Sequence, residues 1–303
     1  MMGVIVVGST NLDYLLEVAE LPALGETVLA TALTKQPGGK GANQAVAAAR
    51  MGARVTFVGC VGNDDDGTLM LRQLRAEGID TSEVEVLGAH PSGLAIVYVV
   101  SNGDNSIAVV PGANSQLSAT RVHRVLASRV GRGSVVVIQQ EIPADAVRAA
   151  VAAADANGAR VVLNAAPAGG PALELLGFCD PLVVNESEAG HLVGGAVTDR
   201  AAALRAADRL AQRARSVVIT LGSDGAVWSD GPRVTHVPAP SVADVADTAG
   251  AGDAFVGVLA TVLADGGALG DAVEAGVRAG SYAVAHTGAQ SSYPRREDLA
   301  VMT

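Results

Sequence analysis

One stretch of this sequence combines small residues with two carboxylates: Asp247-Thr248-Ala249-Gly250-Ala251-Gly252-Asp253. It precedes the apolar run 256–264, which has the length of a helix. Small residues at a helix N-terminus leave backbone N–H groups accessible, and these donors together with the helix dipole favour an anion such as a phosphoryl group. Asp253 stands where its carboxylate can take a proton from a hydroxyl beside that anion. The alternative is an ordinary capped turn, in which Asp253 only interacts with the first helical turn.

A second glycine-rich element, Gly38-Gly39-Lys40-Gly41-Ala42-Asn43, also runs into a helical segment. Such a loop lets a small polar ligand approach the backbone, and the Asn43 amide offers a donor and an acceptor to sugar hydroxyls. A plain tight turn explains this loop equally well. Two familiar nucleotide motifs are excluded, since a dinucleotide fingerprint needs glycine at Phe255 and a P-loop needs Ser or Thr at Gly41.

The third polar element is Gly8-Ser9-Thr10-Asn11-Leu12-Asp13, at the end of the first apolar run. Asn11 and Asp13 have side chains that can bind hydroxyl groups. Asp13 fits an exposed carboxylate at a strand end equally well.

Short apolar runs bounded by Gly, Asn or Asp predict the strands that position these motifs. Most read as strands buried on both faces, which is typical of a parallel sheet. Helical segments lie between them, and several end at glycine. We therefore predict an α/β fold with a doubly wound, mostly parallel sheet, helices on both faces and ligands at the carboxyl ends of the strands. The predicted strands are 4–7, 55–58, 94–100, 135–138, 161–163, 182–184 and 217–221, and the helices include 42–51, 69–77 and 144–157.

Two segments, 12–36 and 91–111, interrupt this alternation and predict a separate small β-sheet. Pro22 and Gly25 break any helix in the first. In the second, two apolar runs flank the turn 101–106, which is rich in Gly, Asn and Asp. No linker or internal repeat divides the chain, so we expect a single α/β domain over residues 1–303 with a lid made from the two segments.

Composition excludes several classes of protein. The chain has 49% hydrophobic and 17% charged residues, enough to bury a large core. Its formal charge of −10 disfavours a nucleic acid partner. Cys60 and Cys179 have no metal-binding or disulfide spacing and are expected to be buried and free. The apolar run 4–7 has no basic residues before it and is too short for a signal peptide or a membrane span, so we expect a cytoplasmic protein without a membrane partner.

Seven motifs, present in order over nearly the whole length, resemble those of the PfkB family of carbohydrate kinases. The loop Gly38–Ala45 points to the members that act on ribose. The seven are Gly8–Asp13, Pro22–Val28, Gly38–Ala45, Glu141, Asn185–Glu188, Thr220–Gly225 and Asp247–Phe255.

The resemblance implies a role for each matching residue around the sugar. Asp253 is expected to be the catalytic base for the primary hydroxyl of the sugar. The backbone of Ala249 to Gly252, including Gly250 and Ala251, is expected to receive the γ-phosphoryl group of ATP. The expected sugar-binding residues are Asn11, Asp13, Gly39, Lys40, Gly41, Asn43, Glu141 and Asp253.

The resemblance also implies a nucleotide site and two cations. Glu188 is expected to organise Mg²⁺, through water because Mg²⁺ gives up its water ligands reluctantly. The nucleotide-binding residues are expected to be Asn185, Thr220, Gly222, Ser223, Gly225, Gly252 and Val277, and those around an activating K⁺ are Asp247, Ala249, Ala283, His286, Gly288 and Ser292. The chain departs from the family pattern at Val277, an apolar residue beside the expected adenine, and at His286 in the cation loop.

The expected reaction is thus the ATP-dependent phosphorylation of D-ribose to D-ribose 5-phosphate, by a homodimer that pairs its lids. A kinase for deoxyribose, fructose or a ribonucleoside is the first alternative. A non-catalytic sugar sensor on the same scaffold is the second, although a sensor has no need of the base Asp253. For Asp247 the alternative to K⁺ binding is a simple hydrogen bond to the turn.

Overall fold

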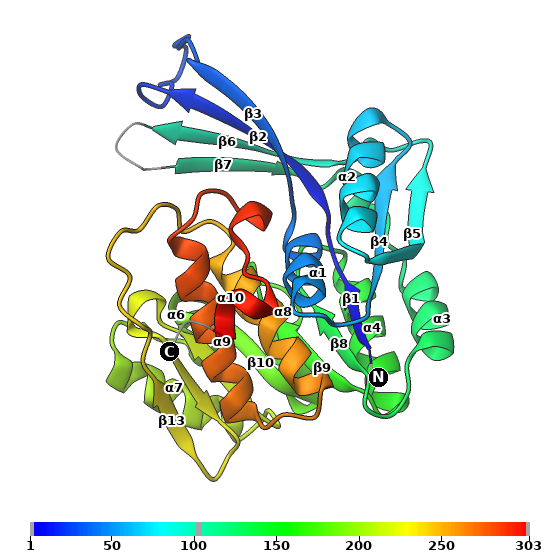
Figure 1. Cartoon of the computed structure of the whole chain (residues 1–303). Helices are drawn as coiled ribbons and strands as arrows, with labels where there is room; N and C mark the ends of the chain where they lie inside the picture. The colour runs from blue at the N-terminus through cyan, green and yellow to red at the C-terminus, as the bar shows by residue number, and fades with distance from the viewer. Residues whose placement is uncertain (1–2, 101–104, 301–303) are drawn as a thin grey trace.

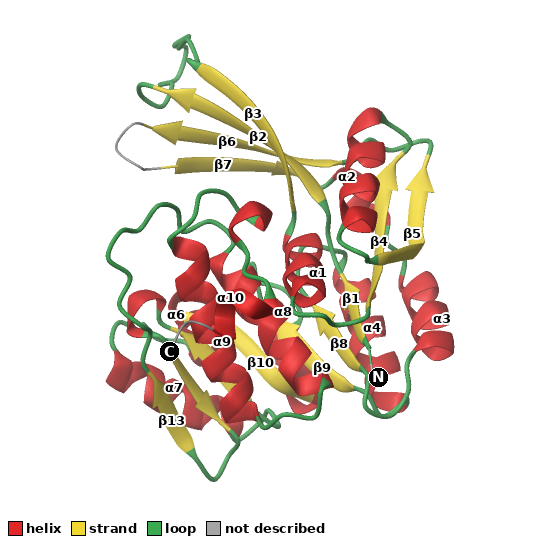
Figure 2. Ribbon diagram, in the orientation of Figure 1, coloured by secondary structure: helices red, strands yellow, loops and turns green. Residues whose placement is uncertain are grey.

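The computed structural model describes residues 3–100 and 105–300. Its strands form two sheets, one of nine strands and one of four. The larger sheet lies inside the body of the molecule, and the smaller one stands at one end of that body (Figure 1, Figure 2). No helix in the described part of the chain is long and apolar enough to cross a membrane.

The large sheet is made from short, mostly apolar strands. They are β1 Val4–Val7, β4 Val55–Gly62, β5 Asp80–Leu87, β8 Val135–Ile138, β9 Arg160–Asn164, β10 Cys179–Asn185, β11 Val217–Thr220, β12 Ala226–Ser229 and β13 Val234–Val237. Their order is β13-β12-β11-β10-β9-β8-β1-β4-β5. The strands from β11 to β5 are parallel, whereas β12 and β13 add an antiparallel edge. The carboxyl ends of β1, β8, β10 and β11 therefore lie at the same edge of the sheet.

Helices cover both faces of this sheet (Figure 2). They are α1 Lys40–Arg50, α2 Asp65–Ala76, α3 Ala119–Arg129, α4 Ala144–Ala156, α5 Ala172–Leu175, α6 Glu186–Val193, α7 Arg200–Ala211, α8 Ala251–Ala264, α9 Leu269–Val284 and α10 Arg296–Ala300. Helices α3, α4, α6 and α7 contribute to the core on one face, and α1, α8 and α9 to the core on the other.

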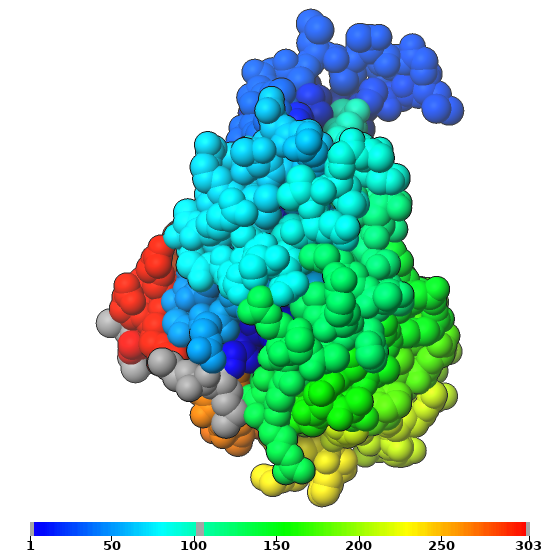
Figure 3. Space-filling view, turned by 90° about the vertical axis from the view of Figure 1, so that its right-hand side faces the viewer, coloured from blue at the N-terminus to red at the C-terminus, as the bar shows by residue number. Residues whose placement is uncertain are grey.

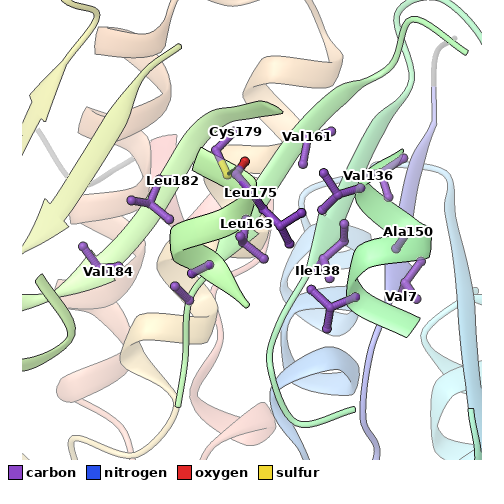
Figure 4. Close-up of a cluster of buried hydrophobic side chains, with 14 of the residues drawn as sticks. Val7, Val136, Ile138, Ala150, Val161, Leu163, Leu175, Cys179, Leu182 and Val184 are labelled. Carbon is purple, nitrogen blue, oxygen red and sulfur yellow. Dashed lines mark hydrogen bonds between the residues drawn. The ribbon is translucent and has the colours of Figure 1, made fainter. Parts of the chain in front are cut away.

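Alternate side chains of each central strand enter opposite cores. Ile5 and Val7 of β1 belong to the cluster with α4, part of which is drawn in Figure 4. Val4 and Val6 belong to the cluster with α1 and α8. Because both sides of the strand are buried, it reads as a continuous apolar run, and the predicted doubly wound α/β fold is confirmed.

The small sheet consists of β2 Asn11–Val18, β3 Ala32–Gly38, β6 Gly93–Val100 and β7 Asn105–Val110, in the order β3-β2-β6-β7. Strands β2 and β6 are parallel, and the outer pairs are antiparallel. The segment with β2 and β3, dark blue, projects beyond the body in the turned view of Figure 3. Part of the predicted turn 101–106, residues 101–104, lies outside the described residues.

Several local predictions agree with the structure. Strands β1 and β8 have the predicted bounds, and α4 ends one residue before the predicted end. Cys60 and Cys179 are buried and free, as predicted. The edge strands β5 and β13 are not among the predicted strands, because neither is a continuous apolar run.

Candidate active site

Helix α8 begins at the small-residue stretch and carries Asp253 in its first turn. The preceding Gly250 has a φ of +74°, a left-handed conformation that favours glycine. The ring of Tyr293 packs against Gly250, where a Cβ atom would collide with it. The first N–H groups of a helix have no intrahelical partners and lie at the positive end of its dipole. A helix end of the kind that suits an anion therefore lies beside the Asp253 carboxylate, and Asp253 is only 7% exposed.

Helix α1 brings the second glycine-rich loop to Asp253. Gly39 precedes this helix with a φ of +88°, and a Cβ atom there would lie 2.8 Å from the backbone nitrogen of Asn11. From the first turn of α1, Asn43 Nδ2 donates a hydrogen bond of 2.9 Å to Asp253 Oδ2. The loop after Gly38 and the start of α8 thus form one site, although more than 200 residues separate them.

Charges around Asp253 act in opposite directions on its pKa. Burial raises the pKa of this carboxyl, as does the charge of Glu141. The positive charge of Lys40 and the hydrogen bonds from its amide neighbours oppose that increase. The pKa of Lys40 is itself raised, chiefly by Asp253. Lys40 is therefore charged at neutral pH and can favour the carboxylate form of Asp253.

Glu141 ties the end of β1 to the start of α1. It follows β8, and its Oε2 accepts a 2.5 Å hydrogen bond from Ser9 Oγ and a 3.0 Å bond from the backbone N–H of Lys40. The backbone N–H of Gly41 in turn donates to Ser9 Oγ at 3.4 Å. These bonds hold the polar loop after β1 against the glycine-rich loop before α1.

Asp13 projects from β2 towards the same group of carboxyls. It lies against Gly38, whose missing side chain leaves room for the carboxylate. Burial, then Glu141 and then Asp253 raise the pKa of Asp13 to about 7. The structure therefore excludes the exposed strand-end alternative for Asp13.

Asn11 is held by a residue that the sequence does not single out. Its Oδ1 accepts a 2.8 Å hydrogen bond from Asn114 Nδ2. The Asn114 side chain also bonds to the backbone N–H and C=O of Thr10, each at 3.0 Å. Asn114 thereby fixes the chain where it passes from the large sheet into β2.

A pocket of about 600 Å³ opens on the other side of the α8 N-terminus. Its walls include apolar side chains of Phe255, Val277 and Val284 and the backbone-rich turn after β11. Of the expected nucleotide residues, Thr220, Gly222, Ser223, Gly225, Gly252 and Val277 line it. This is a cavity with an anion-binding helix end at one side and an apolar wall, which suits a nucleotide.

Asn185 and Glu188 do not line this pocket among the described residues. They form a capping box at the start of α6: Asn185 Oδ1 accepts from the Glu188 N–H at 2.8 Å, and Glu188 Oε2 accepts from the Asn185 N–H at 2.9 Å. Burial raises the pKa of Glu188, Lys40 lowers it and Asp253 raises it. The Glu188 carboxylate thus caps its own helix and is also influenced by the charges of Lys40 and Asp253.

Asp247 connects the small-residue turn to the loop after α9. Its Oδ1 accepts from the Ala249 N–H and its Oδ2 from the Gly288 N–H, both at 2.9 Å. These hydrogen bonds are the ones expected if Asp247 only stabilises the turn and does not bind K⁺. His286 turns its ring onto Tyr282, with 4.3 Å between ring centroids. Ala283 and Ser292 are buried in the segment that α9 and the following loop form.

Some polar residues of the site were not predicted from the sequence. Ser9 lies within the motif Gly8–Asp13, so its position beside Asn11 and Asp13 indicated that it could belong to the site. Asn114 stands in a turn with no recognisable pattern, and Gln290, which donates from Nε2 to Asn43 Oδ1 at 3.0 Å, stands near the end of the chain. Only the folded chain brings these residues to the site.

Comparison with known proteins places this fold and site in a family. The model of the pfkB family carbohydrate kinases matches residues 1–296. The chain therefore belongs to the pfkB family of carbohydrate kinases, as the sequence motifs predicted.

Individual relatives are similar over almost their whole length. The chain is 37% identical to a ribokinase of Haemophilus influenzae, covering 97% of this chain and 95% of the relative. It is 36% identical to a deoxyribokinase of Salmonella typhi, covering 98% and 97%. A solved structure of Arabidopsis thaliana ribokinase complexed with ribose and ATP superimposes with a TM-score of 0.88 at 30% identity, covering 99% and 98%.

Proposed function

We propose that this protein transfers the γ-phosphoryl group of ATP to the primary hydroxyl of D-ribose, which gives D-ribose 5-phosphate. The observation that carries the proposal is the position of Asp253. This carboxylate lies at an anion-binding helix end, between a cluster of hydroxyl-binding side chains and a pocket suited to a nucleotide. The similarity to ribokinases supports the choice of sugar.

In this proposal Asp253 takes the proton of the sugar hydroxyl as that oxygen attacks phosphorus. The N–H groups around Gly250, Ala251 and Gly252 receive the charge that develops on the phosphoryl oxygens. Phosphoryl transfer needs alignment and charge stabilisation more than covalent catalysis, so these parts are sufficient. The sugar is bound by Asn11, Asp13, Gly39, Lys40, Gly41, Asn43 and Glu141, and the nucleotide by Asn185 and the residues that line the pocket.

The same geometry also suits close chemical relatives of ribose. Identity to the deoxyribokinase is nearly as high as to the ribokinase, so deoxyribose is the first alternative. A ribonucleoside is disfavoured because the chain has only eight aromatic residues to stack on a base. A sensor without activity remains the alternative from another class.

An assay of ADP release over a panel of sugars tests the proposal. We expect kcat/KM to be highest for ribose among ribose, deoxyribose, fructose and adenosine. A higher value for deoxyribose would reassign the substrate within the family. No ADP release with any of them, from protein that binds ATP, would favour the sensor.

Magnesium fits the site through phosphate and water rather than through a cage of side chains. Among residues 3–100 and 105–300 no three His, Cys, Asp or Glu side chains gather in a way that could hold a metal ion. Mg²⁺ commonly binds with one or two carboxylates, several waters and substrate phosphates. Glu188, whose pKa is influenced by the charges of Lys40 and Asp253, is the carboxylate that we propose to hold those waters. The ion supplies charge neutralisation on the transferring phosphate.

We also propose an activating K⁺ site behind the small-residue turn. Carboxylate and carbonyl oxygens are the ligands that hard cations prefer, and Asp247 already joins the turn to the loop that carries the other expected ligands. Activity with Mg·ATP and ribose is expected to rise several-fold when K⁺ replaces Na⁺ at fixed ionic strength. In Asp247→Ala that rise should vanish while ribose binding is largely retained. Equal rates in both salts would leave Asp247 only its bridging hydrogen bonds.

The small sheet is proposed to act as a lid, part of a single domain, and to pair with the lid of a second copy. Register places Asp13, Ala95 and Val109 in one cross-strand row, so Ile107 and Val109 share the face of Asp13. Leu33 lies on the opposite face, and all three apolar side chains are more than half exposed. A second copy packed on the face of Ile107 and Val109 would cover the apolar side chains there with two-fold symmetry.

Light scattering at micromolar concentration should therefore give the mass of a dimer. Ile107→Lys should shift the mass towards the monomer, because it places a charge in the paired surface. Phe178→Lys changes an exposed apolar residue outside the small sheet and should leave the dimer intact. A strictly monomeric parent protein would contradict the pairing.

A further inference from the structure

Gln44 contacts Asp253 from a position that no ligand can reach. Its side chain is completely buried, and its Nε2 donates to Asp253 Oδ1 at 2.9 Å. The preceding residue, Asn43, donates to the other carboxylate oxygen. Two consecutive amides of α1 thus hold the two oxygens of one carboxylate.

The orientation of the Gln44 amide is fixed by its neighbours. An ionised carboxylate only accepts hydrogen bonds, so Gln44 must turn its nitrogen towards Asp253. The second N–H of that nitrogen donates to Asn164 Oδ1 at 2.9 Å. Asn164 presents its oxygen because its own nitrogen donates to the carbonyl of Val183 at 3.2 Å. Both hydrogens of the Gln44 amide are therefore used.

Gln139, directly after β8, holds the other end of the same amide. Its Nε2 donates to Gln44 Oε1 at 2.5 Å, and its side chain is also completely buried. Gln139 Oε1 has no hydrogen-bond partner among the described residues. It lies against Gly8, where a Cβ atom would collide with it. A buried acceptor without a partner is unfavourable, so the bond to Gln44 and the contact with Gly8, directly after β1, must hold Gln139 in this orientation.

We propose that Gln44 is a positioning residue for Asp253, holding the plane of its carboxylate fixed while sugar binds and product leaves. The inference rests on the proposed role of Asp253 as the base. Asn43 makes an equivalent bond, but it is also assigned to the sugar and can exchange partners when the sugar enters. The bond from Gln44 does not depend on the ligand, because Gln44 and the amide side chains of Asn164 and Gln139 that hold it are buried.

The bond also favours the charged form of Asp253. The other ionisable groups that influence this carboxyl are Lys40, Glu141, Asp13, Glu188 and Tyr293, from five different segments. Only Lys40 among them favours the charged form. Loss of the Gln44 donor therefore lets the pKa of Asp253 rise further, because burial is the largest influence on it.

Steady-state kinetics of Gln44→Met test the proposal. We expect kcat to fall roughly tenfold to a hundredfold, as is typical when a reacting group is displaced by about 1 Å. The KM for ribose should change far less, and the acid limb of the pH profile of kcat/KM should move to higher pH. Thr261→Val is the control, since it removes a buried hydroxyl on α8 whose partners among the described residues are backbone carbonyls only. It should leave both kcat and the acid limb unchanged.

An unchanged kcat per active site and an unchanged acid limb in folded Gln44→Met would overturn the proposal. If that variant does not fold, Gln139→Met replaces it, because this change removes the bond to Gln44 Oε1 without touching Asp253. Its acid limb should move in the same direction, and an unmoved limb would overturn the proposal. Asp253→Asn separates the two ideas: retained activity there refutes the base itself, whereas an inactive Asp253→Asn beside an unaffected Gln44→Met refutes only the positioning role.

Discussion

Asp253→Asn is expected to lower kcat at least roughly a hundredfold, because assistance from a general base is typically worth about 10²–10⁴. The variant keeps the shape of the side chain but offers only one acceptor oxygen to the two amides that now donate to it. A modest loss of stability should accompany the loss of turnover. ATP binding, measured by calorimetry, should stay within a few-fold of the parent protein.

The control for this change is Asp271→Asn, which removes an exposed carboxylate from the first turn of the neighbouring helix α9. It changes the net charge and a helix terminus in the same way but lies outside the site. Its turnover should equal that of the parent protein. If Asp253→Asn retained most of its activity, another group would have to accept the proton.

Local sequence signals were sufficient for much of the fold. An uninterrupted apolar run such as Val4–Val7 is too short for a typical helix and is typical of a strand with both faces buried, and glycine at a helix end marks where the helix stops. Strand β5 alternates polar and apolar residues at the sheet edge, so it gives no such run. Helix α8 starts at Ala251, five residues before its apolar run. Its first turn consists of small residues and Asp253, so the apolar pattern does not show where the helix begins.

The residues of the candidate site also differ in how far the sequence predicts them. Asn11, Asp13 and Asn43 stand inside recognisable motifs, the first two at the start of β2 and the third in the first turn of α1. Gln139 follows the predicted strand β8 as one of two consecutive glutamines, and nothing local distinguishes it. Its contact with Gln44 spans 95 residues and exists only because β8 lies beside β1 in the sheet. Gln139 therefore has no sequence signal of its own, although its partner Gln44 stands inside the Gly38–Ala45 motif.

Asp13→Ala should raise the dissociation constant for ribose roughly tenfold to a hundredfold and leave that for ATP nearly unchanged. A hydrogen bond to a charged group is worth about 1.5–3 kcal/mol, and each 1.4 kcal/mol is about tenfold in affinity. Asp13 lies against Gly38 and is not among the residues that line the pocket proposed for the nucleotide. Glu17→Ala is the control, because Glu17 is an exposed carboxylate on the same face of the same strand, four residues further on. Equal weakening of ribose and ATP would count against this placement.

The pKa of Asp13 gives the same prediction a pH dependence. With a pKa raised to about 7, Asp13 is mostly a carboxylate at pH 8 and mostly protonated at pH 6. Only the carboxylate accepts hydrogen bonds at both oxygens, so ribose affinity should fall as the pH decreases through 7, by about tenfold between pH 8 and 6. Calorimetric titration of the parent protein and of Asp13→Ala over this range measures the effect. The variant should bind weakly with a flat profile, and a flat profile in the parent protein would show that Asp13 does not meet the sugar as a carboxylate.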